Sequence, residues 1–439
     1  MARAKKDSDF RYNTGESRVP WAAVGENYNQ QDVMEVVKFL MQGDGAVYDA
    51  RVESVREAVS ALAEVSTPPA KLSLDVEVAK CEKKAAEYVG IDDCVFLTNC
   101  TAGFEIAYKY VNLQPGDEVI VPAITFIATM AYPLSVGAKV VFCDVDPRTL
   151  NMDPDDLAKK ITNKTKMVVP VHIGGYPCDM DRIMDIAHTH GALVLEDAAH
   201  GFGAKYKGRN IGAIADFTSF SFHEVKNNTS FGEGGILMTT VPEFKSSLRR
   251  ARFLGVDFSM PPIKDWLYNV AALPGKYGPV VAGNASTTEI QALGLSLQID
   301  RYGKILEERA RCARYVTQRL QGVPGVIPQD LGAGGTVPTF HLYQLQIDPA
   351  ELGGDIQVFK KKLTERGVTN IPHFGPLYRF QILQELGYDA DAIAATCPNT
   401  EEVFYHRFTH LPIYGLTEEQ LDYMIQAIKE TAAEMRGSK

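Results

Sequence analysis

Residues 193–235 read LVLEDAAHGFGAKYKGRNIGAIADFTSFSFHEVKNNTSFGEGG, and this stretch decides the fold. It opens with an apolar run that holds the acid pair Glu196-Asp197, and a glycine-rich segment leads to a second apolar run, FTSFSFH. Lys226 follows the second run, and the turn GEGG closes the stretch. Such runs predict two buried strands. Because neighbouring side chains of a strand point to opposite faces, Glu196 and Asp197 are predicted to face opposite ways.

Three side chains of this stretch suit the chemistry of pyridoxal phosphate (PLP). The amine of Lys226 can form a Schiff base with the PLP aldehyde. The carboxylate of Asp197 can pair with the protonated pyridine nitrogen, and the Ser221 hydroxyl can bind the phosphate. Other interpretations stay open, because a loop lysine is normally a solvated charge and Asp197 could cap a helix that starts at Ala198. In the PLP interpretation, burial lowers the pKa of Lys226 from its usual ~10.4.

The blocks EDAAH, SFSFHEVKNN and GEGG resemble the signature of the DegT–DnrJ–StrS, or sugar aminotransferase, family of fold-type I PLP enzymes. The resemblance covers the chain from about residue 19 to about residue 429. It implies that Asp197 is the pyridinium partner and that Lys226 is the Schiff-base lysine. It also implies that His200 lies beside the cofactor ring oxygen and that Ser221 is a phosphate ligand. Without the resemblance, His200 could be a satisfied core residue.

From residue 93 onward, strand-like and helix-like segments alternate. Apolar runs of this length between helical segments predict a parallel sheet covered by helices on both faces. The resemblance implies the same class: an α/β fold of the fold-type I PLP transferases. This fold has a large domain with a mostly parallel sheet and a smaller C-terminal α+β domain. The predicted strands are CVFLTN, EVIVPA, KVVFCDVD, MVVPVHI, ALVLED and, after Gly235, ILMTT.

Several candidate site residues fall at or just past the ends of these strands. Ligands of parallel sheets bind beyond the carboxyl ends of the strands, so the topology predicts that these residues converge. A substrate role for His172, and for His373 in the block IPHFG, stays open. The residues at the strand ends are Thr101, Thr125, Phe126, His172 and Asp197.

The segment from residue 99 to residue 103, NCTAG, joins a predicted strand to a predicted helix. Backbone N–H groups at a helix N-terminus form an anion site, and the family places its PLP phosphate loop here, which implies Thr101 and Ala102 as cofactor ligands. Thr101 could instead be only an N-cap. The resemblance implies that Phe126 stacks on the pyridine ring, whereas an aromatic residue near a strand end is more often core.

Asn284 stands where the family has an Asn-Tyr-Arg block. The resemblance implies that this Asn reaches the cofactor phosphate of the neighbouring subunit, so that a homodimer shares its active sites. The block here reads Gly283-Asn284-Ala285-Ser286, and the Tyr and Arg are absent. We therefore expect that Asn284 keeps its contact with the cofactor phosphate of the neighbouring subunit. We also expect that the residues facing the substrate differ from those of the family.

The chain is predicted to have four parts. Residues 1–45 form an N-terminal segment with one helix, and residues 46–75 form a helical insertion relative to the family. The large PLP-binding domain spans residues 76–300, and the small C-terminal domain spans residues 301–439. The insertion is either a surface helical hairpin or a wall over the substrate site.

Composition limits the kinds of partner and the location that fit this sequence. The 439 residues carry a formal net charge of −10, which argues against nucleic acid as a partner. The seven cysteines are odd in number and form no CxxC pair, as expected for reduced thiols in the cytoplasm. The start MARAKKDSDF lacks the apolar core of a signal peptide. No apolar run approaches the ~20 residues of a membrane span, and no metal site is predicted.

These observations lead to a functional hypothesis. The resemblance implies an aminotransferase that takes an amino group from glutamate or glutamine, with pyridoxamine phosphate as the second cofactor form. The acceptor is a keto-sugar, nucleotide-linked or not, or a cyclitol ketone, and Lys226 is the acid–base group. Two alternatives stay open: a dehydratase of the same family, whose members replace the lysine with histidine, and a non-catalytic protein on the same fold.

Overall fold

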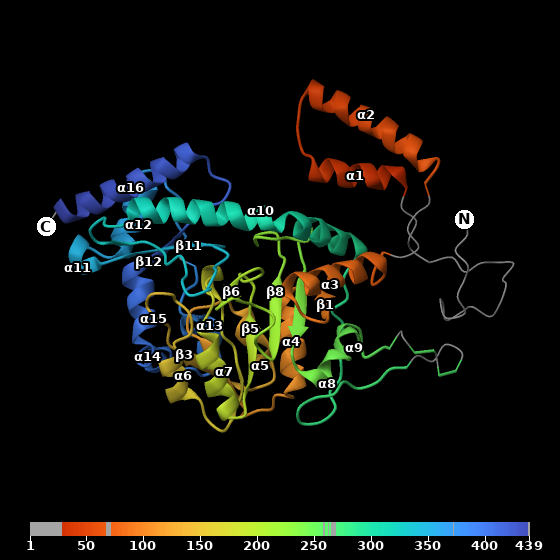
Figure 1. Ribbon diagram of the computed structural model, residues 1–439, viewed down its shortest axis with the longest axis horizontal. Coiled ribbons are helices and arrows are strands. Elements are labelled where there is room, and N and C mark those ends of the chain that lie inside the picture. Colours follow the sequence, from red (N-terminus) through yellow and green to blue (C-terminus); the bar gives the residue numbers. More distant parts are fainter. Residues whose placement is uncertain are drawn as a thin grey trace. The chain divides into compact units, whose positions relative to one another are not determined.

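The computed structural model describes residues 29–66, 72–257, 260–261, 263–264, 269–371 and 373–437 (Figure 1). The chain divides into two compact units. One comprises residues 1–72 and 258–269, and the other comprises residues 73–257 and 270–439. The sheets that carry the candidate site belong to the second unit.

The first unit contains a helical hairpin. Helix α1 (Gln30–Leu40) begins at a capping box, because Asn29 Oδ1 accepts from the Asp32 N–H while the Asp32 carboxylate accepts from the Asn29 N–H. Helix α2 (Ala46–Ala63) lies where the second helical segment was predicted, and none of its residues is buried. The relation of this hairpin to the substrate site stays a prediction.

The second unit is built on a seven-stranded sheet in the order β1-β9-β8-β5-β4-β2-β3. The strands from β8 to β3 run parallel, and β9 is antiparallel to both of its neighbours. The predicted α/β class with a mostly parallel sheet is confirmed. The strands span Cys94–Leu97 (β1), Glu118–Pro122 (β2), Lys139–Cys143 (β3), Thr165–Val168 (β4), Leu193–Asp197 (β5), Phe217–Ser221 (β8) and Gly235–Thr239 (β9).

Helices cover this sheet on both faces, as predicted. Alternate side chains of β1 enter different cores: Val95 and Leu97 belong to one apolar cluster, and Phe96 belongs to another. The first cluster contains residues of α4 (Cys100–Tyr110), α5 (Ala128–Ser135), α8 (Pro242–Lys245) and α9 (Leu248–Arg252). The second contains residues of α3 (Val76–Val89), α6 (Pro154–Lys160), α7 (Met180–Thr189) and the first half of α10 (Glu289–Leu320).

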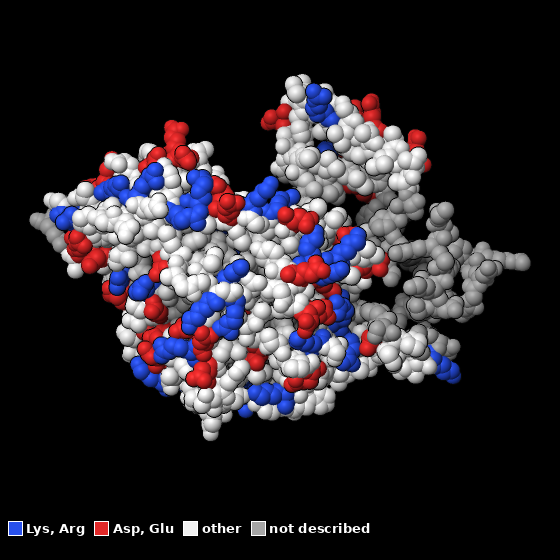
Figure 2. All heavy atoms as spheres, in the orientation of Figure 1, with Lys and Arg blue, Asp and Glu red and all other residues white. Residues whose placement is uncertain are grey.

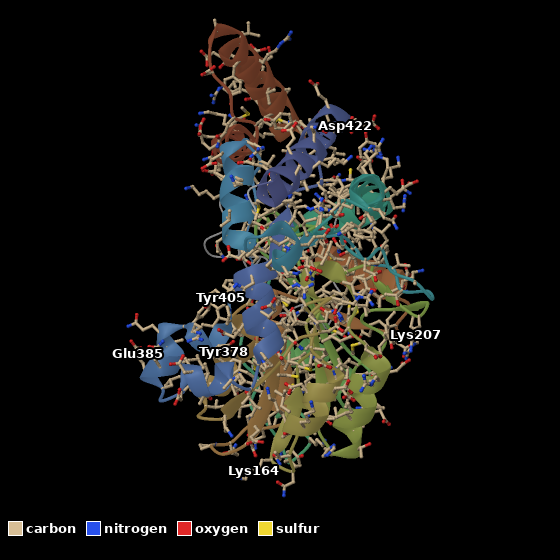
Figure 3. The ribbon with its side chains drawn as sticks, turned by 90° about the vertical axis from the view of Figure 1, so that its left-hand side faces the viewer. Lys164, Lys207, Tyr378, Glu385, Tyr405 and Asp422 are labelled. Atoms are coloured by element: carbon tan, nitrogen blue, oxygen red, sulfur yellow. The ribbon has the colours of Figure 1, made fainter. Side chains whose placement is uncertain are left out.

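A three-stranded antiparallel sheet forms the centre of the C-terminal part. Lys164, just before β4, and Asp422 lie at opposite ends of the unit (Figure 3), so this part lies toward the carboxyl ends of the large sheet. Its core is a separate apolar cluster that includes the second half of α10. The elements are β10 (Val326–Ile327), β11 (Tyr343–Ile347), β12 (Phe408–Leu411), α11 (Pro349–Leu352), α12 (Ile356–Glu365) and α16 (Glu418–Gly437).

Helix α10 links the two cores without interruption. Its capping box at Thr288 starts the helix, Leu295 packs in a core of the large sheet, and Val316 packs in the core of the small sheet. The predicted boundary between residues 300 and 301 therefore lies inside one continuous helix. A rigid element thus carries residues from the large sheet to the small one.

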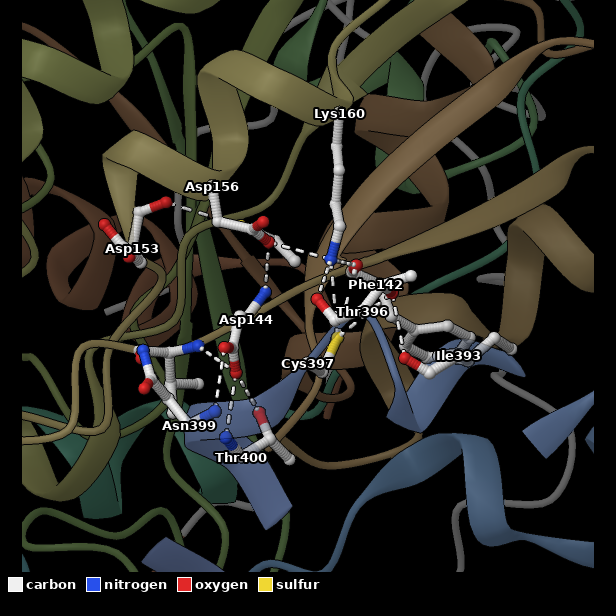
Figure 4. A network of polar contacts seen from close by, with 12 residues as sticks. Phe142, Asp144, Asp153, Asp156, Lys160, Ile393, Thr396, Cys397, Asn399 and Thr400 are labelled. Atoms are coloured by element: carbon white, nitrogen blue, oxygen red, sulfur yellow. Dashed lines mark hydrogen bonds and ion pairs between the residues drawn. The ribbon is translucent and has the colours of Figure 1, made fainter. Parts of the chain in front are cut away.

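A buried polar network also ties the C-terminal part to the large sheet (Figure 4). The Asp144 carboxylate follows β3, is buried, and accepts from the N–H and the hydroxyl of Thr400, each at 2.8 Å. Lys160 Nζ donates to the carbonyl oxygens of Phe142 and Thr396 at 2.8 and 2.9 Å. These bonds hold the segment that contains α14 (Ala390–Ala394) and α15 (Pro398–Glu402) against the sheet; α13 (Gln381–Glu385) precedes this segment in the chain.

The visible surface carries both signs of charge. Lysine and arginine side chains are interspersed with aspartate and glutamate on the face that Figure 2 shows. Within the described ranges, no helix has the length and apolar character to cross a membrane. The same residues include no group of three or more His, Cys, Asp or Glu side chains that could hold a metal ion.

Candidate active site

A cavity of about 770 Å³ lies at the carboxyl ends of the parallel strands. Residues that follow the large-sheet strands line it on one side, and residues of the C-terminal part, among them His410 and Tyr414, line it on the other. Ala102 and Asn284 are not among its lining residues. The other six predicted site residues line it together: Thr101, Phe126, Asp197, His200, Ser221 and Lys226.

Asp197 ends β5 and is 4% exposed. Its carboxylate accepts from the Ala199 N–H at 3.0 Å, within a turn rather than at the start of a helix. Burial raises its pKa above the ordinary value, and the Ala199 N–H and the Lys226 amine oppose that rise. Glu196 faces the other way, as predicted, and accepts from the Thr218 hydroxyl. A buried carboxylate that needs a positive partner therefore points into the cavity.

Lys226 lies in the loop between β8 and β9 and is half-buried. Burial lowers the pKa of its amine from the ordinary value, and the Asp197 carboxylate opposes that shift. The amine forms no hydrogen bond or ion pair with any residue in the described ranges. The side chain is therefore not a solvated surface charge, and its amine is free to react.

His200 and Phe126 form part of an aromatic wall. The His200 ring stacks on the His341 ring with centroids 4.2 Å apart, and Phe374 lies 6.1 Å from His200 and 6.0 Å from Phe126. Burial lowers the pKa of His200 well below its ordinary value, so the ring is neutral. Phe126 is 56% exposed and borders the cavity, so it is not a core residue.

The start of α4 has a cap that the sequence analysis did not identify. Asn99 Oδ1 accepts from the Ala102 N–H at 3.0 Å, so Asn99 is the N-cap and the Ala102 N–H is already used. Thr101 lies in the first turn with its side chain on the cavity. Two glycines allow the start of α4 to pack closely against β9 and β8. A Cβ on Gly235 would lie 2.2 Å from the carbonyl carbon of Asn99, and a Cβ on Gly103 would lie 2.2 Å from Ser219 Oγ.

The lining residues fit PLP. Two buried polar atoms on the cavity, His200 Nδ1 and Thr125 Oγ1, have no hydrogen-bond partner among the described residues. Lys226 offers an amine for the aldehyde, and Asp197 offers a carboxylate for the pyridinium. The Thr101 and Ser221 hydroxyls, beside the open N-terminus of α4, suit a phosphate.

The structure places His172 and His373 differently. His172 is fully buried behind Asp197 and does not line the cavity; its Nδ1 accepts from the Cys178 N–H at 3.1 Å. His373 lines the cavity, and burial lowers its pKa. Asn284 is exposed, and its side-chain oxygen accepts from the N–H and the hydroxyl of Ser286.

Among the lining residues of the C-terminal part, sequence reasoning missed four polar side chains, His410, His341, Arg309 and Tyr414. Burial lowers the pKa of His410 to about 3, and His341 is held by a 2.7 Å hydrogen bond between its Nδ1 and Asn227 Oδ1. Arg309 and Tyr414 line the same side of the cavity. The available signal was weak: His341 and His410 stand in or beside strand-like runs, TFHLYQLQI and FTHL, where a histidine is an unusual core residue.

Comparisons with known proteins show which family the chain belongs to. A model of the DegT/DnrJ/EryC1/StrS aminotransferase family matches residues 56–429. The spore coat polysaccharide biosynthesis protein SpsC of Bacillus subtilis is 34% identical over 367 residues, which cover 82% of this chain and 90% of SpsC. The GDP-perosamine synthase of Caulobacter vibrioides is 32% identical over 355 residues, which cover 80% of this chain and 89% of that protein.

Among solved structures, the PLP form of Spr1654 from Streptococcus pneumoniae has a TM-score of 0.72 and 26% identity, and the match covers 87% of this chain and 96% of that one. Fold and site together define a PLP-dependent aminotransferase. The chain belongs to the DegT/DnrJ/EryC1/StrS aminotransferase family, as the sequence resemblance predicted.

Proposed function

We propose that this aminotransferase moves an amino group from glutamate or glutamine to a keto-sugar, nucleotide-linked in our preferred form, or to a cyclitol ketone. The observation that carries the proposal is the placement of the Lys226 amine and the Asp197 carboxylate on one cavity at the carboxyl ends of the sheet. The relative named GDP-perosamine synthase supports a nucleotide-linked substrate. Pyridoxamine phosphate is the second cofactor form in this proposal.

The cavity residues divide into those that hold the cofactor and one that moves protons. PLP, when bound, supplies an electron sink that acidifies the C–H bond next to the substrate nitrogen. Asp197 would hold the ring nitrogen, and Thr101 and Ser221 would bind the phosphate. Phe126 and His200 would lie against the ring. Lys226 would take the proton from the substrate carbon and return it, a role that its lowered pKa suits.

A homodimer with shared sites is part of the proposal. Phe231 packs over Gly294 of α10, and beside it Ile290, Leu293 and Leu297 are exposed apolar side chains. Exposed apolar clusters of this kind are typical of protein–protein interfaces. A cytoplasmic location is also proposed, and it is supported by the cysteines, since all seven are buried and free.

An absorbance spectrum and an amine-transfer assay test the proposal. The PLP-loaded protein should show a visible band that Lys226→Ala lacks, and it should form an amino sugar from a panel of nucleotide-linked keto-sugars with glutamate or glutamine. Loss of water from the substrate without amine transfer would identify the dehydratase instead. A protein with neither the band nor turnover would be the non-catalytic alternative.

A further inference from the structure

Two arginines are buried within the described ranges, and their surroundings differ. Arg252 is 6% exposed, and its guanidinium forms an ion pair with the buried carboxylate of Glu82. Arg309, on α10, is 8% exposed, lines the active-site cavity, and forms no ion pair with any described carboxylate. The chain therefore neutralises one buried guanidinium and leaves the other, in the cavity, without a counter-charge.

Most of the hydrogen-bonding capacity of Arg309 is unused. Its Nη1 lies 3.3 Å from the Phe340 carbonyl oxygen and 3.4 Å from that of His341. A guanidinium has five N–H donors, and the buried Nε of Arg309 has no partner among the described residues. The Tyr414 ring covers one face at 4.2 Å. Burial lowers the pKa of Arg309, as expected for a cation that lacks an acid.

Arg309 and Lys226 are the only arginine and lysine among the described residues that line the cavity. Burial lowers the pKa of His200, His341 and His373, so these lining rings are neutral. The lining carboxylates have other partners: Asp197 faces the cofactor position, and Glu233 lies 3.6 Å from His223. An anion that enters the cavity therefore finds a guanidinium with free donors.

Arg309 lies outside the layer that would touch the cofactor. His341 stacks on His200, and Arg309 contacts the backbone carbonyl of His341. The guanidinium thus contacts neither His200 nor Lys226, the two residues of this site that would touch the cofactor, among its described contacts. A substrate group bound there lies away from the carbon that reacts at Lys226.

Resting on the proposed function, we propose that Arg309 binds an anionic group of the substrate that is remote from the reacting carbon. Its source is either the second carboxylate of an amino donor such as glutamate or the phosphate of a nucleotide-linked ketone. Both present paired anionic oxygens that accept parallel N–H bonds from a guanidinium. Arg309 therefore selects substrates by charge.

A purely structural role makes a different prediction. If Arg309 only held the Phe340 and His341 carbonyls, its loss would slow every substrate by the same factor. If it binds the remote anion, its loss slows charged substrates and spares neutral ones. The ratio between a charged substrate and its neutral counterpart separates the two roles.

The donor arm of the experiment compares glutamate with glutamine, which differ in side-chain charge. The variants are Arg309→Gln, Arg309→Lys and, as a matched control, Arg314→Gln, an exposed arginine of the same helix. In Arg309→Gln, kcat/KM of the donor half-reaction for glutamate should fall about 10- to 100-fold relative to glutamine. Arg309→Lys should show a smaller loss, and Arg314→Gln should show none.

The phosphate arm needs no turnover. Calorimetry measures the binding of GDP and UDP, with guanosine and uridine as neutral counterparts, to the PLP-loaded protein. Arg309→Gln should weaken diphosphate binding about 10- to 100-fold and leave the nucleosides unchanged. A selective loss in the donor arm identifies the carboxylate, and a selective loss in this arm identifies the phosphate.

Equal effects on charged and neutral ligands, or no effect in either arm, would overturn the inference and leave Arg309 a structural residue. Circular dichroism checks the fold; if Arg309→Gln does not fold, a folded Arg309→Lys without a selective change overturns the inference equally. Failure of the parent protein to transaminate would contradict the proposed function instead, and the calorimetric arm would still report on the anion site.

Discussion

At Lys226, burial and a neighbouring charge act on the amine in opposite directions. Burial lowers its pKa, and the Asp197 carboxylate raises it, with a net lowering. An amine reacts with an aldehyde only when it is uncharged, so the lowering increases the reactive fraction near neutral pH. The same burial raises the pKa of Asp197, whose charge is stabilised once a pyridinium lies beside it.

We expect Lys226→Ala to abolish transamination without unfolding the protein, because the half-buried side chain supplies the nucleophile but little core volume. The measurement is a single-turnover assay beside thermal unfolding. Lys304→Ala, an exposed position on α10 without an ion pair among the described residues, is the control and should behave like the parent. Near-normal turnover of Lys226→Ala without added amine would exclude Lys226 as the reactive residue.

Asp197→Asn should change both rate and pH dependence. The pyridinium loses its counter-charge, so turnover should fall on the order of 100-fold. Removing the carboxylate also removes the charge that raises the Lys226 pKa, so that pKa falls further and the amine loses its proton at lower pH. The midpoint of PLP capture by the apoprotein, followed by absorbance against pH, should therefore move to lower pH. An unchanged midpoint in Asp197→Asn, or an equal shift in the exposed control Asp185→Asn, would contradict this coupling.

The sequence predicted the site residues that lie within the continuous stretch of residues 193–235. Asp197, Ser221 and Lys226 follow strand ends within 30 residues, so topology alone brings them together. Arg309 and His341 could not be predicted in the same way. Arg309 reaches the cavity on α10, which crosses from one core to the other, and His341 reaches it from the segment just before β11. Both placements are consequences of tertiary packing.

At the scale of elements, β9 packs against the start of α4, where the cofactor phosphate is proposed to bind. Gly235 begins β9, and the backbone of Asn99 lies where its Cβ would be. The last glycine of the GEGG turn is thus required by a close approach and not by a positive φ. The sequence identified Gly235 only as part of the GEGG block that resembles the family signature. The pattern could not show that this glycine packs against the backbone of Asn99, which lies 136 positions earlier in the chain.

Gly235→Ala should displace the first turn of α4, because the new methyl group would overlap backbone that cannot rotate away. We expect a loss of about 1–3 kcal/mol of unfolding free energy and weaker PLP binding. Denaturant unfolding and PLP titration measure the two effects. Gly303→Ala is the matched control: it lies in α10 with open space around it and should stabilise the protein by about 0.5–1 kcal/mol. Equal behaviour of the two variants would refute the close-contact argument.

At the scale of the whole molecule, the two sheets of the second unit and the helix α10 account for the cavity. The alternation of apolar runs predicted the large sheet, and the family resemblance implied the smaller C-terminal part. The prediction for Asn284 concerns a dimer of the chain rather than a single copy. Asn284 is exposed, does not line the cavity of its own chain, and its side-chain NH₂ donates to no residue in the described ranges. Its predicted role therefore requires a second copy of the chain.

Mixing two inactive variants tests whether the sites are shared. Asn284→Asp should place a negative charge against the neighbour's phosphate and weaken its cofactor binding, and Lys226→Ala removes the reactive amine from its own chain. In a mixed dimer one site carries both defects, while the other takes Lys226 from one chain and Asn284 from its partner, both intact. Activity should return on subunit exchange, in at most one of the two sites of each mixed dimer. Two differently tagged chains, captured in sequence, establish that mixed dimers form. If mixed dimers form but show no activity, Asn284 does not serve the neighbouring site. In that case the site that combines an intact Lys226 with an intact Asn284 from the partner would be inactive, although the proposal requires no other change.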